Sequence, residues 1–167
     1  ASETTQEMAD DYVRMACAEV KFMKMPASSA EQSLNRNVLV VGGGMTGLTA
    51  ATEITKAGYS ATIVEKSNAL GGMTAKLHKR IPNFSPYAEP QNTGVEELIA
   101  AVNANDKITV HLSSTLTKTA GAPGRFKADI TTESGNTTTA DFGAIVQASG
   151  FTQYDASQLP EFAYGKT

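Results

Sequence analysis

Three glycines stand directly after the short apolar run of residues 38–41. They are Gly42, Gly44 and Gly47, and their spacing is Gly-x-Gly-x-x-Gly. In this pattern the first glycine permits a tight turn, the second lets the backbone approach a pyrophosphate, and the third lets a helix pack closely on a strand. The following helix would present unpaired N–H groups and its positive dipole end to the phosphates. The spacing therefore indicates a dinucleotide held by bare backbone.

A carboxylate follows the glycines at a suitable separation. Glu65 ends a second apolar run, residues 61–64, and lies 18 residues beyond Gly47. In a dinucleotide-binding unit an acid about 20 residues past the glycines accepts hydrogen bonds from the ribose hydroxyls. We therefore expect Glu65 to bind the adenosine ribose. The pair Gly71 and Gly72 comes shortly afterwards and would let the backbone run alongside a diphosphate.

The elements that must position these residues follow from the spacing of apolar side chains. Residues 38–41 form a continuous apolar run, which is typical of a strand buried on both faces. Leu48, Ala51 and Ile54 recur at helical spacing, and Gly58 stands where a helix C-cap is expected. The order of strand, glycines, helix, strand and acid predicts a βαβ unit. The alternative is a glycine-rich turn that binds no nucleotide.

A second helix and a third strand are expected further along the chain. The helix spans residues 93–102, with Thr93 as N-cap and Glu96 completing a capping box. The strand spans residues 108–112 and includes His111, which we interpret as a structural residue. Together with the first unit, these elements give the β-α-β-α-β order of a mononucleotide-binding half.

The remainder of the chain changes to a period of two. Residues 115–142 predict an antiparallel meander, with a hairpin turn at residues 133–136. Residues 143–150 then predict another buried strand, whose small terminal residues would approach a ligand closely. The predicted fold class is α/β: a Rossmann-like parallel sheet with helices and an antiparallel β-meander insertion, preceded by an N-terminal helix.

The N-terminal part is expected to stand apart from this fold. Residues 8–25 predict an amphipathic helix, docked on its own domain or offering a methionine-rich surface to a partner. Pro26 would end the helix, and a polar linker would lead to the first strand. The predicted organisation is residues 1–36 as N-terminal helix and linker, and residues 37–167 as the nucleotide-binding domain.

Composition excludes several classes of protein. The net charge is −3 and the chain has no block of Lys and Arg, which argues against nucleic-acid and anionic-membrane partners. No apolar run approaches the roughly 20 residues that span a bilayer. The acidic, polar start is unlike a signal peptide, so a cytoplasmic location is expected. Cys17 is the only cysteine, and His78 and His111 lack carboxylate partners, so we expect neither a disulfide nor a metal site.

These motifs, in this order, resemble the FAD-binding part of two-dinucleotide-binding flavoproteins. The second glycine pair and the small-residue ending Ala148, Ser149 and Gly150 are the features that favour FAD over NAD. Within that superfamily the chain resembles the A subunit of heterodisulfide reductase and its relatives. The likeness there lies in residues 11–16, 71–79 and 154–165.

The resemblance implies an FAD-binding domain of an electron-transferring oxidoreductase that works with other subunits of an electron-transfer complex. Lys66 would flank the adenine, and the N-terminal helix would allow homo-oligomers. No catalytic acid or base is identified. The candidate cofactor-binding residues are Gly42, Gly44, Met45, Thr46, Gly47, Glu65, Lys66, Gly71, Gly72, Met73, Leu116, Ala148, Ser149 and Gly150.

The chain also departs from that family. Members commonly carry iron–sulfur cysteines after the glycine pair, where this chain has residues 83–87 without cysteine, and it has no cysteine pair for disulfide chemistry. It stops before the later Gly-Asp segment and has no second nucleotide domain. We therefore expect a fragment of a longer flavoprotein that is not active alone. The alternatives are an NAD-binding dehydrogenase domain, or a non-catalytic assembly module that keeps the fold without cofactor.

Overall fold

The computed structural model describes residues 3–24, 34–159, 161 and 164. The chain divides into two compact units, Ala1–Ser33 and Leu34–Thr167. The expected division into an N-terminal helix with linker, residues 1–36, and a nucleotide-binding domain, residues 37–167, stays a prediction. The first unit contains one described element, helix α1, and the second contains every strand that the structure describes.

Helix α1 spans Glu3–Phe22. It begins five residues earlier than predicted and ends before Met23, while Met25 and Pro26 lie outside the described residues. Met8, Tyr12 and Met15 recur at helical spacing on one face, and α1 has no buried residue. Docking of this helix on its own domain stays a prediction. Among the described residues, none of the helices has the length and apolar character that crossing a membrane requires.

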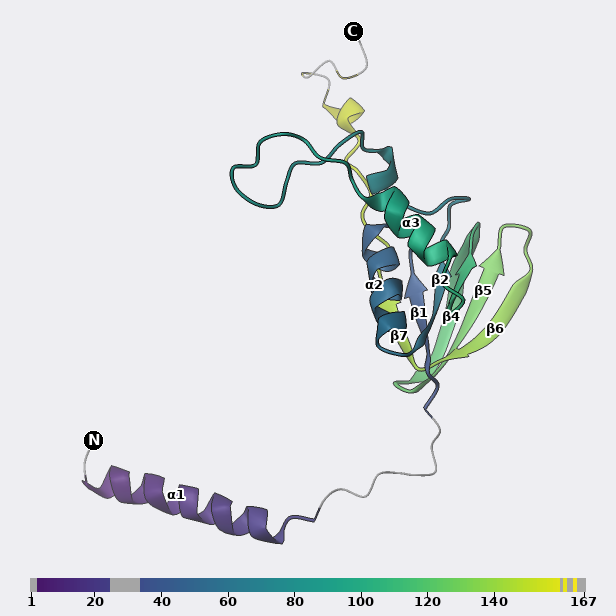
Figure 1. Ribbon diagram of the computed structural model, residues 1–167. Helices are drawn as coiled ribbons and strands as arrows, with labels where there is room; N and C mark the ends of the chain where they lie inside the picture. Colours follow the sequence, from purple (N-terminus) through teal and green to yellow (C-terminus); the bar gives the residue numbers. More distant parts are fainter. Residues whose placement is uncertain (1–2, 25–33, 160, 162–163, 165–167) are drawn as a thin grey trace. The chain divides into compact units, whose positions relative to one another are not determined.

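The second unit is built on a four-stranded parallel sheet (Figure 1). Helices α2, Met45–Lys56, and α3, Val95–Asn103, connect successive strands, so the predicted β-α-β-α-β order is confirmed. The strands lie in the order β3-β2-β1-β7. Their bounds are β1 Asn37–Val41, β2 Ser60–Val64, β3 Ile108–His111 and β7 Ala144–Gln147.

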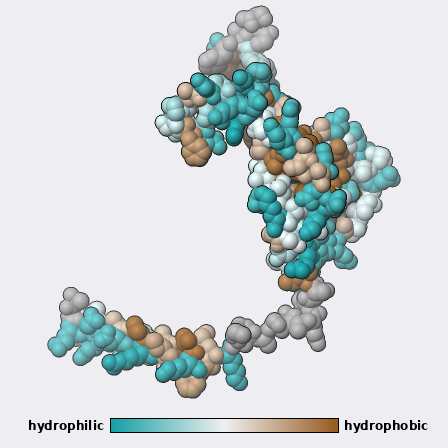
Figure 2. All heavy atoms as spheres, viewed as in Figure 1, coloured by the Kyte–Doolittle hydropathy of each residue, from teal (hydrophilic) through white to brown (hydrophobic). Residues whose placement is uncertain are grey.

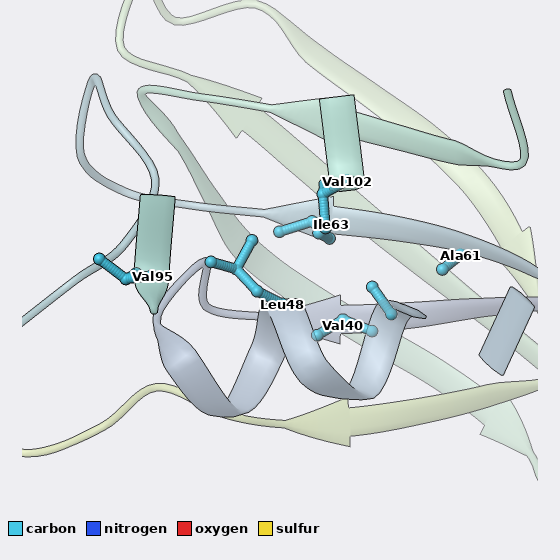
Figure 3. Packing of buried hydrophobic residues seen from close by; sticks show 7 residues of the cluster. Val40, Leu48, Ala61, Ile63, Val95 and Val102 are labelled. Atoms are coloured by element: carbon cyan, nitrogen blue, oxygen red, sulfur yellow. The ribbon is translucent and has the colours of Figure 1, made fainter. Parts of the chain in front are cut away.

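Alternation along the strands divides the core between two faces of this sheet. On one face Val40 and Ile63 pack with Leu48 of α2, and α3 adds Val95 and Val102 (Figure 3). The neighbouring strand residues point the opposite way, because successive side chains of a strand alternate between faces. Leu39 and Val64 therefore enter a second cluster. The strand is therefore buried on both faces at its centre, through Leu39 and Val40, while Val38 and Val41 are half-buried.

The second cluster lies under a three-stranded antiparallel sheet. This meander supplies Ala128, Ile130 and Phe142 to the cluster, and its turn at residues 133–136 is confirmed by the bond from Thr132 N–H to the Asn136 carbonyl, 2.9 Å. The unit therefore has three layers: helices, parallel sheet and meander (Figure 1). The strands are β4 Ser114–Ala122, β5 Arg125–Thr132 and β6 Thr137–Phe142.

Helix α2 ends just before Gly58, as the sequence predicted. Ala57 is the C-cap residue and Gly58, at φ 90°, follows it. The N–H of Gly58 donates to the Thr55 carbonyl at 3.0 Å and that of Tyr59 to the Ile54 carbonyl at 3.2 Å. This pair of bonds is the Schellman motif, which satisfies the last carbonyls of the helix.

Two details of the prediction are wrong. Strand β7 is not a buried strand, since Ala144 and Gln147 are exposed: it pairs with β1 alone and forms one edge of the described sheet.

Helix α3 starts two residues after Thr93, because Gly94 takes a left-handed conformation, φ 74°, that an N-terminal helical residue does not adopt. Thr93 Oγ1 still accepts a long bond, 3.5 Å, from the Val95 N–H, but no bond completes the capping box with Glu96 within the described residues.

Two short 3₁₀ turns complete the second unit. The first, η1, spans Thr74–Lys76 and follows the second glycine pair. The second, η2, spans Ala156–Gln158. Between η1 and α3 the chain forms a long loop that extends away from the sheet (Figure 1).

Candidate dinucleotide-binding site

The glycine turn lies at the carboxyl end of β1, the position where ligands bind in open α/β sheets. Gly42 leaves the strand at φ 110°, a region open to glycine, and its N–H donates to the Val64 carbonyl at 2.8 Å. A Cβ at Gly42 would clash with the Ala148 carbonyl oxygen. The tight turn and its fit under residue 148 therefore both require glycine.

Gly47 meets a different requirement. It lies in the first turn of α2, is buried, and faces back toward the strand. A Cβ here would clash with the Gly42 carbonyl oxygen and would stand 3.3 Å from Cγ1 of Val40. This glycine lets α2 pack directly on β1, which sets where the first N–H groups of the helix lie.

Gly44 is the one member of the motif at which a Cβ would have room, and we call this space the opening. A Cβ here would meet nothing closer than Cα of Gly72, at 3.9 Å, and its backbone is ordinary extended chain, φ −80° and ψ −175°. Neither the fold nor the backbone conformation demands glycine at this position. What a bare position offers here is room for a ligand to approach the backbone.

The second glycine pair lies beside this opening. The N–H of Gly71 donates to the Gly43 carbonyl at 2.7 Å, and Gly44 and Gly71 form a parallel β-bridge. A Cβ at Gly72 would stand 3.0 Å from Cα of Gly44. Two segments of bare backbone, far apart in the sequence, therefore line one opening at the end of the sheet.

Glu65 lies beside the glycine turn that follows β1. It is buried, with 7% of its surface exposed, and both of its carboxylate oxygens accept backbone N–H bonds. Oε2 accepts from Gly43 at 2.6 Å and Oε1 from Ser67 at 2.8 Å. The carboxylate thus ties the turn after β1 to the turn after β2, and each oxygen keeps a second lone pair for another donor.

The same contacts set the charge state of Glu65. Burial by itself raises the pKa of this carboxyl, but the N–H groups of Ser67 and Gly43 favour the ionised form, and the Ser67 hydroxyl and the Lys66 charge add to them. The pKa of Glu65 therefore lies below its ordinary value. The ionised carboxylate is the state that can accept ribose hydroxyls.

Because the pKa of Glu65 is lower in the folded state than in the unfolded state, the stability of the domain depends on pH. Ionised Glu65 contributes stability above the unfolded pKa, and this contribution is lost as pH falls from about 5 through the folded pKa. We expect the urea midpoint to fall less steeply in this window for Glu65→Gln than for the unchanged protein. The matched variant Glu133→Gln, at an exposed turn, should keep the original slope. Equal slopes in all three proteins would contradict the assignment.

The other residues expected at the site fall into two groups. Thr46 and Lys66 are exposed beside the opening, and Met45 lies half-buried in the first turn of α2. Met73 follows the second glycine pair, and its Sδ accepts from Nε2 of Gln153 at 3.4 Å. The side chain of Leu116 is not brought to the glycine turn: it packs, half-buried, in the cluster between sheet and meander.

The strand ending lies close to the first glycine. The N–H of Ala148 donates to the Val41 carbonyl at 2.8 Å, which holds residue 148 against Gly42. Ser149 and Gly150 are exposed, and the hydroxyl of Ser149 accepts from Nε2 of Gln147 at 3.0 Å. These contacts of residue 148 are made by its backbone, and the next two positions are accessible.

Gly43 was missed by sequence reasoning, which took it as a free position of the motif. A Cβ there would stand 2.6 Å from Cδ2 of Leu70 and 3.1 Å from Cβ of Glu65. Its N–H is also the donor to the Glu65 carboxylate. The available signal was the run of three consecutive glycines, of which the motif explains two. Among the described residues no group of His, Cys, Asp and Glu is arranged to hold a metal ion.

Comparisons with known proteins agree with this geometry. The family described as NAD(P)-binding Rossmann-like domain matches residues 40–86, which include the glycine turn, α2, β2 and the second glycine pair. The fold also matches thioredoxin reductase of T. acidophilum, with a TM-score of 0.55 and 20% identity over 72% of this chain and 38% of that one. Residues 40–86 are therefore similar to the NAD(P)-binding Rossmann-like family, and the likeness to thioredoxin reductase is one of fold.

The sequence is also similar to the A subunits of heterodisulfide reductases. It is 30% identical over 123 residues to the A subunit of the ferredoxin/F(420)H(2)-dependent CoB-CoM heterodisulfide reductase of Methanosarcina acetivorans, covering 72% of this chain and 14% of the relative. It is 29% identical over 128 residues to the A subunit of the ferredoxin:CoB-CoM heterodisulfide reductase of Methanosarcina mazei, covering 75% and 15%. The chain thus spans a small part of the length of these relatives.

Proposed function

We propose that this chain binds FAD and forms the dinucleotide-binding part of an electron-transferring oxidoreductase related to the A subunit of heterodisulfide reductase. One observation carries the proposal: the opening in front of Gly44, where the turn after β1 meets the Gly71–Gly72 segment beside the Glu65 carboxylate. Backbone from two segments faces this opening, and the ionised acid borders it.

The residues at the opening fit the parts of the cofactor. The first turn of α2, with Met45 and Thr46, would donate backbone N–H bonds to the pyrophosphate, because the first N–H groups of a helix have no partner within it. Glu65 would accept the ribose hydroxyls with its remaining lone pairs while staying anchored to Gly43 and Ser67. Bound FAD would supply the redox chemistry, and these residues would bind and orient it.

The relatives indicate the setting in which such a domain works. Two of them carry ferredoxin and the CoB-CoM heterodisulfide in their names. By analogy, this chain would act beside other subunits and exchange electrons with a small protein carrier. It has no cysteine pair of its own that could reduce a disulfide, since Cys17 is its only cysteine.

A titration of FAD fluorescence tests the proposal together with one variant. Saturable quenching is expected for the unchanged chain, and Gly44→Ala should weaken binding by roughly 2 kcal/mol or more, because the new methyl group occupies the space that the pyrophosphate needs. The variant should keep its far-ultraviolet circular dichroism, since alanine adopts this extended backbone freely. Lys56→Ala, at the exposed other end of α2, is the control and should bind FAD normally.

Two outcomes would overturn the proposal. If NADH quenches with saturation while FAD does not, the chain is an NAD-binding dehydrogenase domain, an alternative that the match to an NAD(P)-binding family favours. If neither nucleotide binds, the chain is an assembly module that retains the fold alone.

A further inference from the structure

The loop between η1 and α3 concentrates positive charge. Lys76, Lys79 and Arg80 fall within five consecutive positions, and all three are exposed. The second unit as a whole is balanced, with eleven Lys and Arg against eleven Asp and Glu in Leu34–Thr167. We call residues 76–91 the cationic loop. It is a local positive region on a unit with no net charge of its own.

The charges of the cationic loop have no partners among the described residues. No ion pair joins Lys76, Lys79 or Arg80 to a carboxylate there, whereas Lys56 pairs with Glu53 at 2.7 Å and Lys127 approaches Asp141 at 4.0 Å. An unpaired cluster of like charges repels itself, so the fold gains nothing from this arrangement. Its positive potential is available to an outside anion.

The loop is tied at its base. The N–H of Arg80 donates to the Gln91 carbonyl and the N–H of Gln91 to the Arg80 carbonyl, each at 2.8 Å. This reciprocal pair makes an antiparallel bridge, so the residues between Arg80 and Gln91 form one closed loop. The arrangement fixes the backbone of Arg80, so its guanidinium is presented from an anchored position.

Apolar side chains are exposed beside these charges. Leu77, Ile81, Phe84 and Tyr87 have 51%, 58%, 82% and 59% of their surfaces exposed. Arg80, Phe84 and Tyr87 also line a hollow of about 300 Å³ within the loop. Figure 2 shows apolar residues beside hydrophilic ones on this part of the surface. Exposed aromatic residues bordered by cations are the composition of a protein-binding surface, in which arginine and aromatic residues are enriched.

We propose that the cationic loop is the docking surface for an acidic electron-carrier protein, whose carboxylates pair with Lys76, Lys79 and Arg80 while its apolar centre covers Phe84 and Tyr87. The inference rests on the proposed function, which supplies the need for such a carrier. A carboxylate entering the hollow would meet the guanidinium of Arg80, whose planar fork suits bidentate pairing.

The loop's position in the chain suits this role. Lys76 is four residues beyond Gly72, so the surface begins within about 14 Å of the predicted diphosphate site even for fully extended chain. The small number of charges favours a carrier protein over a nucleic acid, whose binding usually draws on a broad basic surface. Small, transient interfaces of this kind are typical of redox partners.

The test measures binding of a purified acidic [2Fe–2S] ferredoxin to the full chain at about 0.05 M salt, where surface charges are weakly screened. The loop variant is Lys76→Gln/Lys79→Gln/Arg80→Gln. The matched control is Lys118→Gln/Arg125→Gln/Lys127→Gln, which removes three exposed cations from the meander and changes the net charge equally. We expect about a tenfold or greater weakening for the loop variant and less than about twofold for the control. Phe84→Ala/Tyr87→Ala should also weaken binding, without changing its salt dependence.

Equal weakening in the loop and control variants would overturn the proposal, because the effect would then come from net charge alone. Binding of double-stranded DNA or of phosphatidylserine vesicles in preference to ferredoxin would overturn it as well. FAD affinity is measured on the same proteins: its loss in the loop variant would place these cations on the cofactor instead. If ferredoxin binds as expected but FAD does not, the docking surface stands and the proposed FAD site fails.

Discussion

Gly47→Ala is expected to lower the free energy of unfolding of the Leu34–Thr167 unit by roughly 3–5 kcal/mol, enough to leave much of it unfolded. The new methyl group would clash with the Gly42 carbonyl oxygen, and Val40 blocks the space beside it at 3.3 Å. Relief requires α2 to move away from β1, which would open the packing of Leu48 against Val40 and Ile63.

The direction of the change in stability distinguishes the steric clash from the helix propensity of alanine. Alanine in a helix is otherwise favoured over glycine by about 0.5–1 kcal/mol, so without the close contact Gly47→Ala would stabilise the domain. Urea unfolding followed by circular dichroism measures the change. Gly44→Ala is the matched control three residues earlier, where a Cβ has room, and its stability should lie within about 1 kcal/mol of the unchanged protein. A stable Gly47→Ala protein would mean that α2 and β1 are not packed as described.

Glu65→Ala is expected to have two separate effects. In the absence of nucleotide it should destabilise the second unit by roughly 2–4 kcal/mol, because it leaves the N–H groups of Gly43 and Ser67 without their acceptor. It should also weaken FAD binding by about 1.5–3 kcal/mol through loss of a charge-assisted hydrogen bond to the ribose. Urea unfolding measures the first effect and FAD titration, at a temperature where the variant is folded, measures the second.

Two variants separate these roles. Glu65→Gln keeps one carbonyl oxygen as acceptor but turns an NH₂ group toward the other donor, so we expect an intermediate loss of stability. Glu133→Ala, at an exposed turn, should change neither quantity. A normal FAD affinity in folded Glu65→Ala would show that the acid does not contact the ribose. A normal stability would show that its two backbone bonds contribute nothing.

Local patterns in the sequence were enough to predict the order of elements. The apolar run at residues 38–41, the helical spacing of Leu48, Ala51 and Ile54, and the glycine after the helix each act within a few residues. Their physical causes are backbone sterics, side-chain periodicity and the capping of helix ends. These local patterns can therefore be recognised in the sequence without knowledge of the tertiary structure.

Features that depend on neighbours across the sheet were predicted less well. Strand β7 has the sequence of a buried run, yet its burial depends on what pairs with its second edge, and β1 is its one partner in the described sheet. The start of α3 was placed at Thr93, since capping residues were recognised but the left-handed Gly94 was not. Leu116 has an apolar side chain, and its place in the second cluster follows from the packing of the meander.

The order of residues along the chain was enough to predict that a glycine turn precedes a helix and that an acid ends the next strand. The three-dimensional fold was needed to show that Gly71 and Gly72 lie against Gly43 and Gly44, and that Glu65 holds both turns through its two oxygens. The reason is physical: a hydrogen bond between residues more than 20 positions apart leaves no periodic trace in either segment. It forms where the parallel sheet brings the carboxyl ends of neighbouring strands to one edge.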